Sequence, residues 1–196
     1  MTDVLAPIDL HPLLGTRRSS RLFDPAHTVS DAELTALLEA ARWSPSAGNS
    51  QPWSFVVTRR GDLGHDAFVQ RLAPGNALWA PSASALIVAL CRVGDDENRN
   101  TYAAYDLGQS VAHLTVQAQA LGLNVRQFAG FDKDGLAADL EVPAEWKVTT
   151  GVAVGRIHQS VPVDLDPALQ ERDAAPRERR RLDEFVFAGR FGQPHA

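Results

Sequence analysis

The sequence lacks most of what could cross-link, anchor or metallate a chain. Cys91 is the only cysteine in 196 residues, so no internal disulfide can form, which fits a reducing cytoplasm. No apolar run approaches the roughly 20 residues that span a bilayer. The first residues also lack the basic and apolar regions of a signal peptide. These absences predict a cytoplasmic protein that has no membrane segment.

Motifs for several common chemistries are missing as well. There is no G-x-G-x-x-G for a Rossmann unit, no G-x-x-x-x-G-K-[ST] for an NTPase and no G-x-S-x-G for a serine nucleophile. The six histidines are scattered without ligand spacing, which predicts no metal site. A net charge of −5 argues against general nucleic-acid binding.

What the chain does contain is a mixture of helical and strand patterns. Ser30 and Glu33 form an S-x-x-E capping box, which predicts a helix reaching about Ala41. Apolar residues at helical spacing predict the longest helix over 102–121, with Gly122 as its left-handed C-terminal residue. Continuous apolar runs predict strands at 53–57, 85–90 and 151–155. This order favours an α+β fold, with residues 1–16 an arm or a short helix.

The length fits one domain, residues 1–196, but the composition changes near its end. Residues 158–181 are rich in proline and charge, and Leu182–Gly192 contains three phenylalanines. Apolar residues on a terminal extension need a surface to bury against. We therefore expect residues 158–196 to form an extension that wraps a partner subunit.

Two polar segments carry the strongest functional signal. The turn-rich segment 44–52 separates the first helix from the first strand and is filled with small and amide-bearing residues. Arg17, Ser19 and Arg21 place two guanidinium groups and a hydroxyl within five residues, a set that can hold a phosphate. On spacing alone, a solvated basic turn is the simpler interpretation of the second segment. Together and in this order, the two segments resemble the signature of the nitroreductase family of flavin enzymes.

The resemblance implies a bound FMN. Arg17, Ser19 and Arg21 match residues at the phosphate, ribityl chain and pyrimidine edge, and Phe128–Asp132 matches a loop whose backbone approaches flavin N5. A basic pair before a Leu-Asp-Glu stretch matches a second phosphate-binding element, with Arg179 aligned best and Arg180 or Arg181 as its partner. The residues implied to bind the cofactor are Arg17, Arg18, Ser19, Arg21, Pro45, Ser46, Ala47, Asn49, Gln51, Asn76, Gly130, Arg179 and Arg181. Tyr102, Tyr105 and Phe128 either line the substrate face of the flavin or serve as packing.

The resemblance also implies a fold, an assembly and an activity. The fold is α+β, with a central, mostly antiparallel sheet flanked by helices in an interlocked homodimer, and Pro45–Asn49 reaches the flavin of the other subunit. NAD(P)H, a transient electron donor, delivers hydride to flavin N5 and leaves. An electron-poor acceptor such as a nitroaromatic or a quinone is then reduced in a ping-pong cycle. No side chain is implied as a catalytic residue, because the cofactor carries the chemistry.

Other functions remain open at this point. The same scaffold supports specialised flavin enzymes such as dehydrogenases and dehalogenases, and the protein could instead be a non-catalytic flavin-binding or storage protein. A nucleic-acid binder using Arg177–Arg181 is a more distant alternative.

Overall fold

The fold is built around strand β2, Ala85–Arg92, whose apolar side chains are buried on both faces of the sheet. The computed structural model describes residues 10–94, 96–158 and 167–194. The chain divides into two compact units, Met1–Val163 and Asp164–Ala196.

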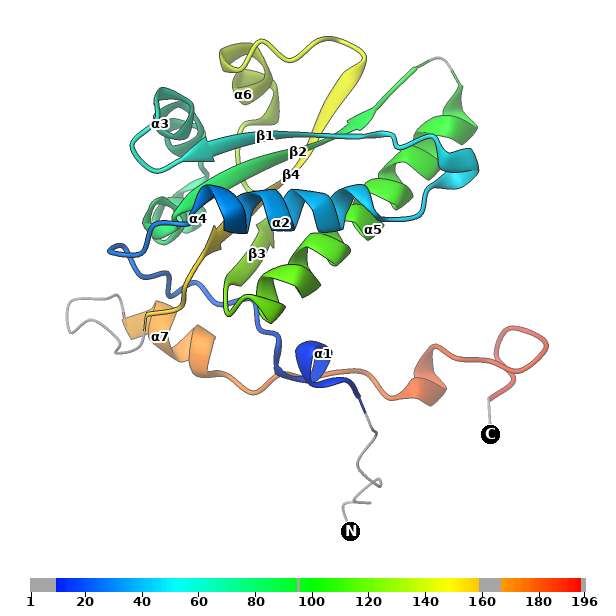
Figure 1. Cartoon of the computed structure of the whole chain (residues 1–196). Coiled ribbons are helices and arrows are strands. Elements are labelled where there is room, and N and C mark those ends of the chain that lie inside the picture. The colour runs from blue at the N-terminus through cyan, green and yellow to red at the C-terminus, as the bar shows by residue number, and fades with distance from the viewer. Residues whose placement is uncertain (1–9, 95, 159–166, 195–196) are drawn as a thin grey trace. The chain divides into compact units, whose positions relative to one another are not determined.

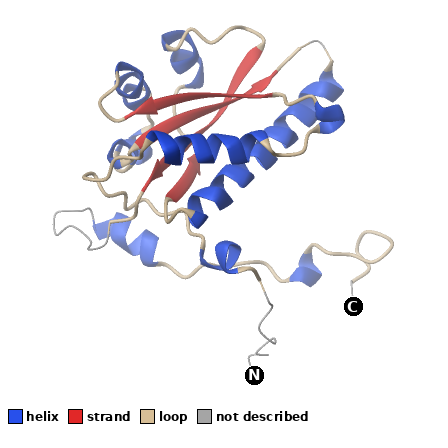
Figure 2. Ribbon diagram, viewed as in Figure 1, coloured by secondary structure: helices blue, strands red, loops and turns tan. Residues whose placement is uncertain are grey.

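The first unit contains one four-stranded sheet in the order β1-β2-β4-β3, and every neighbouring pair is antiparallel. Strand β1 (Trp53–Arg59) and strand β3 (Asn124–Phe128) form the two edges, and β4 (Trp146–Gly155) pairs with both β2 and β3. Figures 1 and 2 show helices of this unit packed against the sheet. The predicted central antiparallel sheet and α+β class are confirmed.

Helices α2 (Asp31–Arg42) and α5 (Glu97–Ala120) cover one face of the sheet (Figure 1). The Ser110 hydroxyl of α5 joins them by donating to the Ala41 carbonyl at 3.0 Å. Apolar side chains from both helices and alternate strand residues form the main core on this face. Helices α3 (Leu63–Gln70) and α6 (Lys133–Asp139) lie on the other face, where Phe68 packs on Phe128 with ring centroids 5.7 Å apart.

Shorter elements complete the two units. They are α1 (Pro12–Thr16), η1 (Ala47–Asn49), α4 (Pro74–Ala77) and η2 (Ala80–Ser82) in the first unit, with α7 (Pro167–Ala174) and η3 (Leu182–Glu184) in the second. Helix α1 favours the short-helix alternative for the described part of the N-terminal segment 1–16, and residues 1–9 lie outside the described residues. None of the helices within the described ranges is long and apolar enough to cross a lipid bilayer.

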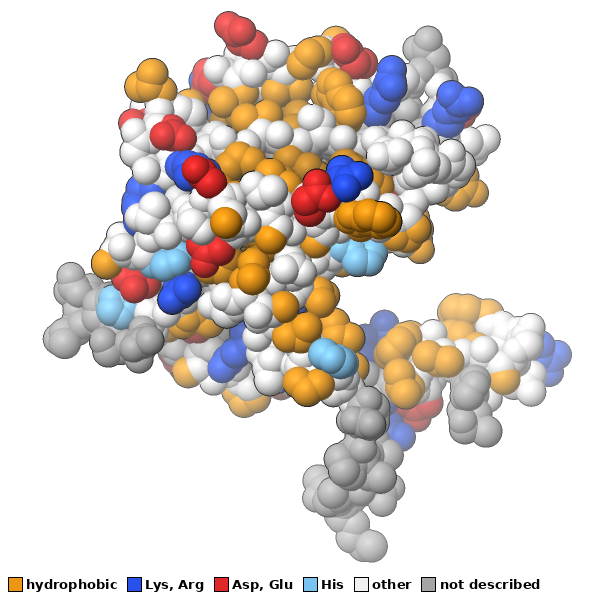
Figure 3. Space-filling model, in the orientation of Figure 1, with side chains coloured by type: hydrophobic (Ala, Val, Ile, Leu, Met, Phe, Trp, Pro, Cys, Tyr) orange, Lys and Arg blue, Asp and Glu red, His pale blue; other side chains and the backbone are white. Residues whose placement is uncertain are grey.

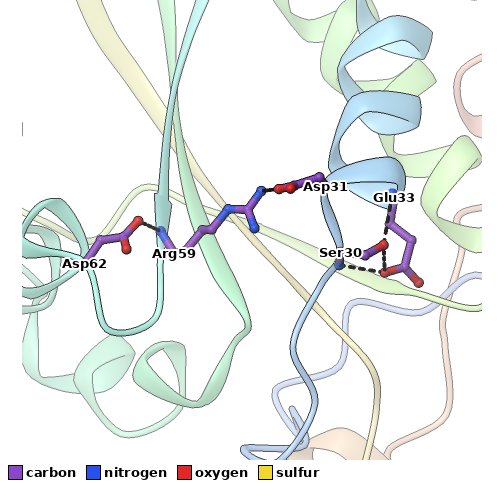
Figure 4. Close-up of polar contacts among 5 residues, drawn as sticks. All are labelled: Ser30, Asp31, Glu33, Arg59 and Asp62. Carbon is purple, nitrogen blue, oxygen red and sulfur yellow. Dashed lines mark hydrogen bonds and ion pairs between the residues drawn. The ribbon is translucent and has the colours of Figure 1, made fainter.

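The capping box predicted at the start of α2 and the left-handed glycine predicted after α5 are both confirmed. Ser30 and Glu33 form a reciprocal capping box, with the Ser30 amide donating to Glu33 Oε2 at 2.8 Å. Figure 4 shows this cap beside the ion pair between Asp31 and Arg59. Gly122 has φ +69°, the left-handed conformation expected after a helix.

Element lengths are where the sequence prediction was wrong. The long helix begins at Glu97 rather than at residue 102, because Asp96 caps it by accepting from the Arg99 amide at 3.1 Å. Strand β4 begins at Trp146 rather than at residue 151, and β1 and β2 each extend two residues past their predicted ends. Strand β3 and helices α3 and α6 were not predicted at all.

Candidate flavin site

The arginine-rich segment Arg17–Arg21, which follows α1 and is called the arm below, is held against strand β3. Asn124 Nδ2 donates to the Ser20 carbonyl at 3.2 Å, and Arg126 Nη1 donates to the Ser19 carbonyl. Arg17 Nη1 in turn donates to Ser19 Oγ at 2.9 Å. The arm therefore has a fixed backbone, and Arg17 and Ser19 already lie side by side, as binding of one phosphate by both would require.

Asn76 and Gly130, which are 54 residues apart in sequence, are in direct contact. Asn76 Nδ2 donates to the Gly130 carbonyl at 2.9 Å, and the Ala73 amide donates to the same oxygen at 3.0 Å. Trp79, a buried residue, donates from Nε1 to Asn76 Oδ1 at 3.2 Å and so orients the amide. A Cβ at Gly130 would lie 2.7 Å from Asn76 Nδ2. Only a residue without a side chain fits there while Asn76 keeps this position.

Arg126 connects the arm to the Asn76–Gly130 pair, and the sequence analysis did not predict it. Besides its bond to Ser19, its guanidinium lies over the Trp79 ring, 5.2 Å from the centroid. A continuous series of contacts thus runs from Ser19 through Arg126 and Trp79 to Asn76 and Gly130. The sequence feature that could have revealed Arg126 is its spacing of two residues from Asn124, which places both polar side chains on one face of a strand.

The second predicted segment, Pro45–Gln51, is a tightly ordered loop. The Ala47 amide donates to Oδ2 of the buried Asp106 of α5 at 2.9 Å, and the Gln51 amide donates to Ser46 Oγ at 3.0 Å. Asn49 and Gln51 have φ of +56° and +48°, in the left-handed region that few residues other than glycine adopt. Such backbone strain is typical of segments that hold a ligand.

Within one chain this loop lies far from the arm. The loop precedes the edge strand β1, whereas the arm and Gly130 adjoin the opposite edge strand β3. Three strand spacings separate these edges, about 14 Å. Along α5 the loop contacts Asp106, whereas the chain just before the arm contacts Gln119, whose Nε2 donates to Thr16 Oγ1 at 3.2 Å. At 1.5 Å per helical residue, those two positions are about 20 Å apart.

A hollow of about 650 Å³ opens beside the loop. It lies between the loop and the first turns of α5, and Tyr102 lines it together with Arg92 and Arg99. Tyr105 is exposed. Phe128 is buried in an aromatic cluster with Phe68, Phe131 and Trp79, so in this chain it serves as packing.

The remaining predicted residues, Arg179 and Arg181, belong to the second unit. Arg179 Nη1 donates to the neighbouring Glu178 carbonyl at 2.6 Å. Arg181 forms an ion pair with Asp183 at 3.1 Å, and hydrogen bonds from Arg181 lower the pKa of the Asp183 carboxyl. Arg180 pairs with Glu184 at 3.1 Å. Both candidates for the second phosphate-binding arginine thus already have a carboxylate neighbour, and their place at a phosphate stays a prediction.

One charged cluster on the far face of the sheet adjoins the Gly130 loop. Arg71 contacts Asp139 and Asp132 at 2.7 and 3.1 Å. Hydrogen bonds from Arg71 hold the pKa of Asp139 below its ordinary value. In the part of the chain that the structure describes, no group of three or more His, Cys, Asp or Glu side chains could hold a metal ion.

The donor set suits FMN. Phosphate needs cationic and hydroxyl donors, which Arg17 and Ser19 supply side by side. A flat polar ring needs amide groups and a backbone that it can approach closely, which Asn76 and the side-chain-free Gly130 supply.

Comparison with known proteins agrees with this geometry. The model of the nitroreductase family matches residues 14–74, which include both the arm and the loop. An uncharacterized 15.4 kDa protein from Mycolicibacterium smegmatis is 38% identical over an alignment of 148 residues that covers 71% of this chain and 98% of that protein. An oxygen-insensitive NADPH nitroreductase from Helicobacter acinonychis is 41% identical over 76 residues, which are 39% of this chain and 35% of that enzyme.

A crystal structure of an oxidoreductase containing FMN matches almost the whole fold. It superposes with a TM-score of 0.85 and 31% identity over 96% of both chains. With this match and with both motifs inside the region of the family model, the chain belongs to the nitroreductase family.

Proposed function

We propose that this protein is an FMN-dependent oxidoreductase that takes electrons from NAD(P)H and reduces an electron-poor small molecule such as a nitroaromatic or a quinone. The observation that carries the proposal is the contact series from Ser19 to Gly130. It links, through direct contacts, residues from three distant segments that the resemblance implies at the FMN. The FMN named for the similar solved structure and the NADPH named for the Helicobacter enzyme support the cofactor and the electron donor.

In this proposal the chain's own residues bind and orient the cofactor. Arg17, Arg18, Ser19 and Arg21 bind the phosphate, the ribityl chain and the pyrimidine edge, and Arg179 and Arg181 complete the phosphate end. Asn76 and the Gly130 backbone face the ring, which when bound supplies hydride acceptance and donation. Donors beside the pyrimidine edge favour negative charge there. No side chain needs to act as an acid or base, since solvent can supply protons.

The proposed assembly is a homodimer in which Pro45, Ser46, Ala47, Asn49 and Gln51 serve the site of the partner subunit. The separation of this loop from the arm by the width of the sheet supports it, because one chain alone does not bring the two together. Exposed apolar side chains on the face of the sheet covered by α2 and α5 also support the homodimer. Figure 3 shows hydrophobic side chains at this surface. Trp43, Tyr102 and Tyr105 are 77%, 57% and 66% exposed.

Two further parts of the proposal rest on single observations. Leu182, Phe185 and Phe191 in the second unit are 61%, 51% and 92% exposed, which supports an extension that wraps the partner. A cytoplasmic location is supported by Cys91, the only cysteine, which is buried and free.

The test is a visible absorption spectrum of the purified protein, followed by anaerobic addition of NADH or NADPH. We expect a flavin spectrum that bleaches with the nicotinamide and recovers when a nitroaromatic or quinone is added. A flavin that never bleaches would favour a flavin-binding or storage protein, or a different electron donor. A protein that neither contains FMN nor binds added FMN would refute the proposal.

The contributions of the two segments can be separated with two variants. Arg21→Ala and Asn49→Ala should each weaken FMN retention, the first by removing a cation and the second by removing an amide across the subunit interface. Undiminished flavin content in either variant would remove that residue from the site.

A further inference from the structure

Arg71, at the C-terminal end of α3, joins two segments through a forked contact. Its Nε and Nη2 donate to the two carboxylate oxygens of Asp139 at 2.7 and 2.9 Å, and its Nη1 donates to Asp132 at 3.1 Å. A guanidinium that is held by two carboxylates in this way has little rotational freedom. The contact fixes the end of α3 against both ends of α6.

The same residue begins a short backbone ladder that ends at Gly130. The Asp132 amide donates to the Arg71 carbonyl at 2.9 Å, Leu72 and Phe131 form an antiparallel bridge, and the Ala73 amide donates to the Gly130 carbonyl at 3.0 Å. The side chain and the backbone of Arg71 therefore both contact Asp132, the last residue of the loop 130–132. The other end of this ladder is the carbonyl that also accepts from Asn76.

The space around the guanidinium is closely fitted. Asp132 accepts from the Gly135 amide at 3.0 Å as the N-cap of α6. A Cβ at Gly135 would lie 2.5 Å from Arg71 Nη1 and 2.1 Å from Asp132 Oδ2. A glycine at this point leaves room for the guanidinium between Asp132 and Asp139.

We propose that Arg71 is a positioning residue for the flavin, which fixes the loop 130–132 so that the Gly130 backbone is held in place to face the bound ring. The inference rests on the proposed function, in which Gly130 lies at the flavin. Arg71 itself touches no cofactor in this scheme and acts through Asp132, Asp139 and the ladder. Because exposed ion pairs add little to global stability, the main effect of losing it is on the loop.

The experiment compares Arg71→Met and Arg71→Lys with a matched control, Arg59→Met. Arg59 is also paired with an aspartate, Asp31 (Figure 4). The Arg59 side chain is 37% exposed, against 36% for Arg71. It joins β1 to α2 and has no contact with the Gly130 loop among those described. Three quantities are measured: the FMN dissociation constant, the absorption spectrum of bound FMN, and amide hydrogen exchange of residues 129–132 in the FMN-free protein.

For Arg71→Met we expect the FMN dissociation constant to rise about tenfold, ~1.4 kcal/mol, with a shifted flavin spectrum and faster exchange at 129–132. Arg71→Lys keeps the charge without the fork and should fall between Arg71→Met and wild type. Arg59→Met should match wild type in all three measurements. Should Arg71→Met fail to fold, Asp139→Asn weakens the same fork from the other side and should give the same three changes.

Three outcomes overturn the inference and are distinguishable. If wild type binds FMN and the Arg71 variants keep its affinity within twofold and its spectrum, the positioning role is wrong while the proposed function stands. If wild type does not bind FMN, the proposed function fails, and the positioning role fails with it. Equal changes in Arg59→Met would show a general loss of stability and would also overturn the inference.

Discussion

Replacing Gly130 with alanine tests the contact on which the candidate site depends. The added Cβ would lie 2.7 Å from Asn76 Nδ2, far inside van der Waals contact, and 3.6 Å from the Ala73 Cβ, an ordinary distance. The strained neighbour is therefore the end of one flexible side chain, which can move away. Moving it breaks the Asn76 bond to the Gly130 carbonyl and the Trp79 bond to Asn76.

The cost follows from these two hydrogen bonds. At about 1 kcal/mol each, their loss should lower the free energy of unfolding by about 2 kcal/mol. For a chain of this size that corresponds to a fall in melting temperature of about 4–8 °C. Asn76→Ala should cost a similar amount, because it removes the same two bonds.

The double variant separates this account from a general packing defect. Once Asn76 is alanine, the Cβ at residue 130 meets only ordinary contacts, so the second substitution should add almost nothing. The double variant should therefore be about 2 kcal/mol more stable than the sum of the two single losses predicts. Urea denaturation of all four proteins gives this coupling energy. Additive losses, or a Gly130→Ala protein as stable as wild type, would refute the proposed contact.

Three further outcomes are expected on the same first unit. Gly151→Ala would place a Cβ 2.5 Å from the Phe128 ring in a filled cluster, and urea denaturation should show a loss of about 1–3 kcal/mol; an unchanged midpoint would contradict the packing. Burial lowers the pKa of His65 below 6.5, so the unfolded chain binds a proton at this residue more readily than the folded chain does. The free energy of unfolding should therefore fall as the pH drops below about 6.5. If a His65→Gln variant lost stability as steeply with falling pH, His65 would not be the cause. Ser30→Ala should cost about 1 kcal/mol at pH 7 through the lost helix cap. The Ser30 amide and hydroxyl both hold the pKa of Glu33 low, and the variant removes only the hydroxyl, so part of this loss should disappear as the pH falls below about 4.5. A pH-independent loss measured by thermal unfolding would argue against the bond from the Ser30 hydroxyl to the Glu33 carboxylate.

Local signals in the sequence were enough to predict the parts of the fold that local physics decides. The Ser30 cap and the left-handed Gly122 depend on neighbouring residues, and both are found as predicted. The first turn of α5 was missed because residues 97–101 are mostly exposed and contribute nothing to the apolar seam. Strand β3 was missed because Arg126 and Gln127 interrupt its apolar pattern, and β4 supplies the pairing that makes it a strand.

In the candidate site, too, the sequence did not reveal the residues whose contacts are made with distant segments. The resemblance pointed to Asn76 and Gly130 as flavin contacts, which stays a prediction, and the structure shows that the two residues are hydrogen-bonded to each other. Arg126 and Arg71 could not be found in this way, since their partners lie 47 to 107 residues away in the sequence. Their chemistry depends on which segments the sheet brings together, and a single sequence gives no direct measure of that.

The separation of the Pro45–Gln51 loop from the arm also has a genetic consequence. On the proposed assembly, each site takes its arm from one subunit and its loop from the other, so lesions in the two segments should complement in trans. A mixed dimer of an Arg21→Ala chain and an Asn49→Ala chain would place both lesions in one site and leave the other site wild type. Two alleles that each weaken FMN retention would then restore one of the two flavin sites in every mixed dimer when expressed together.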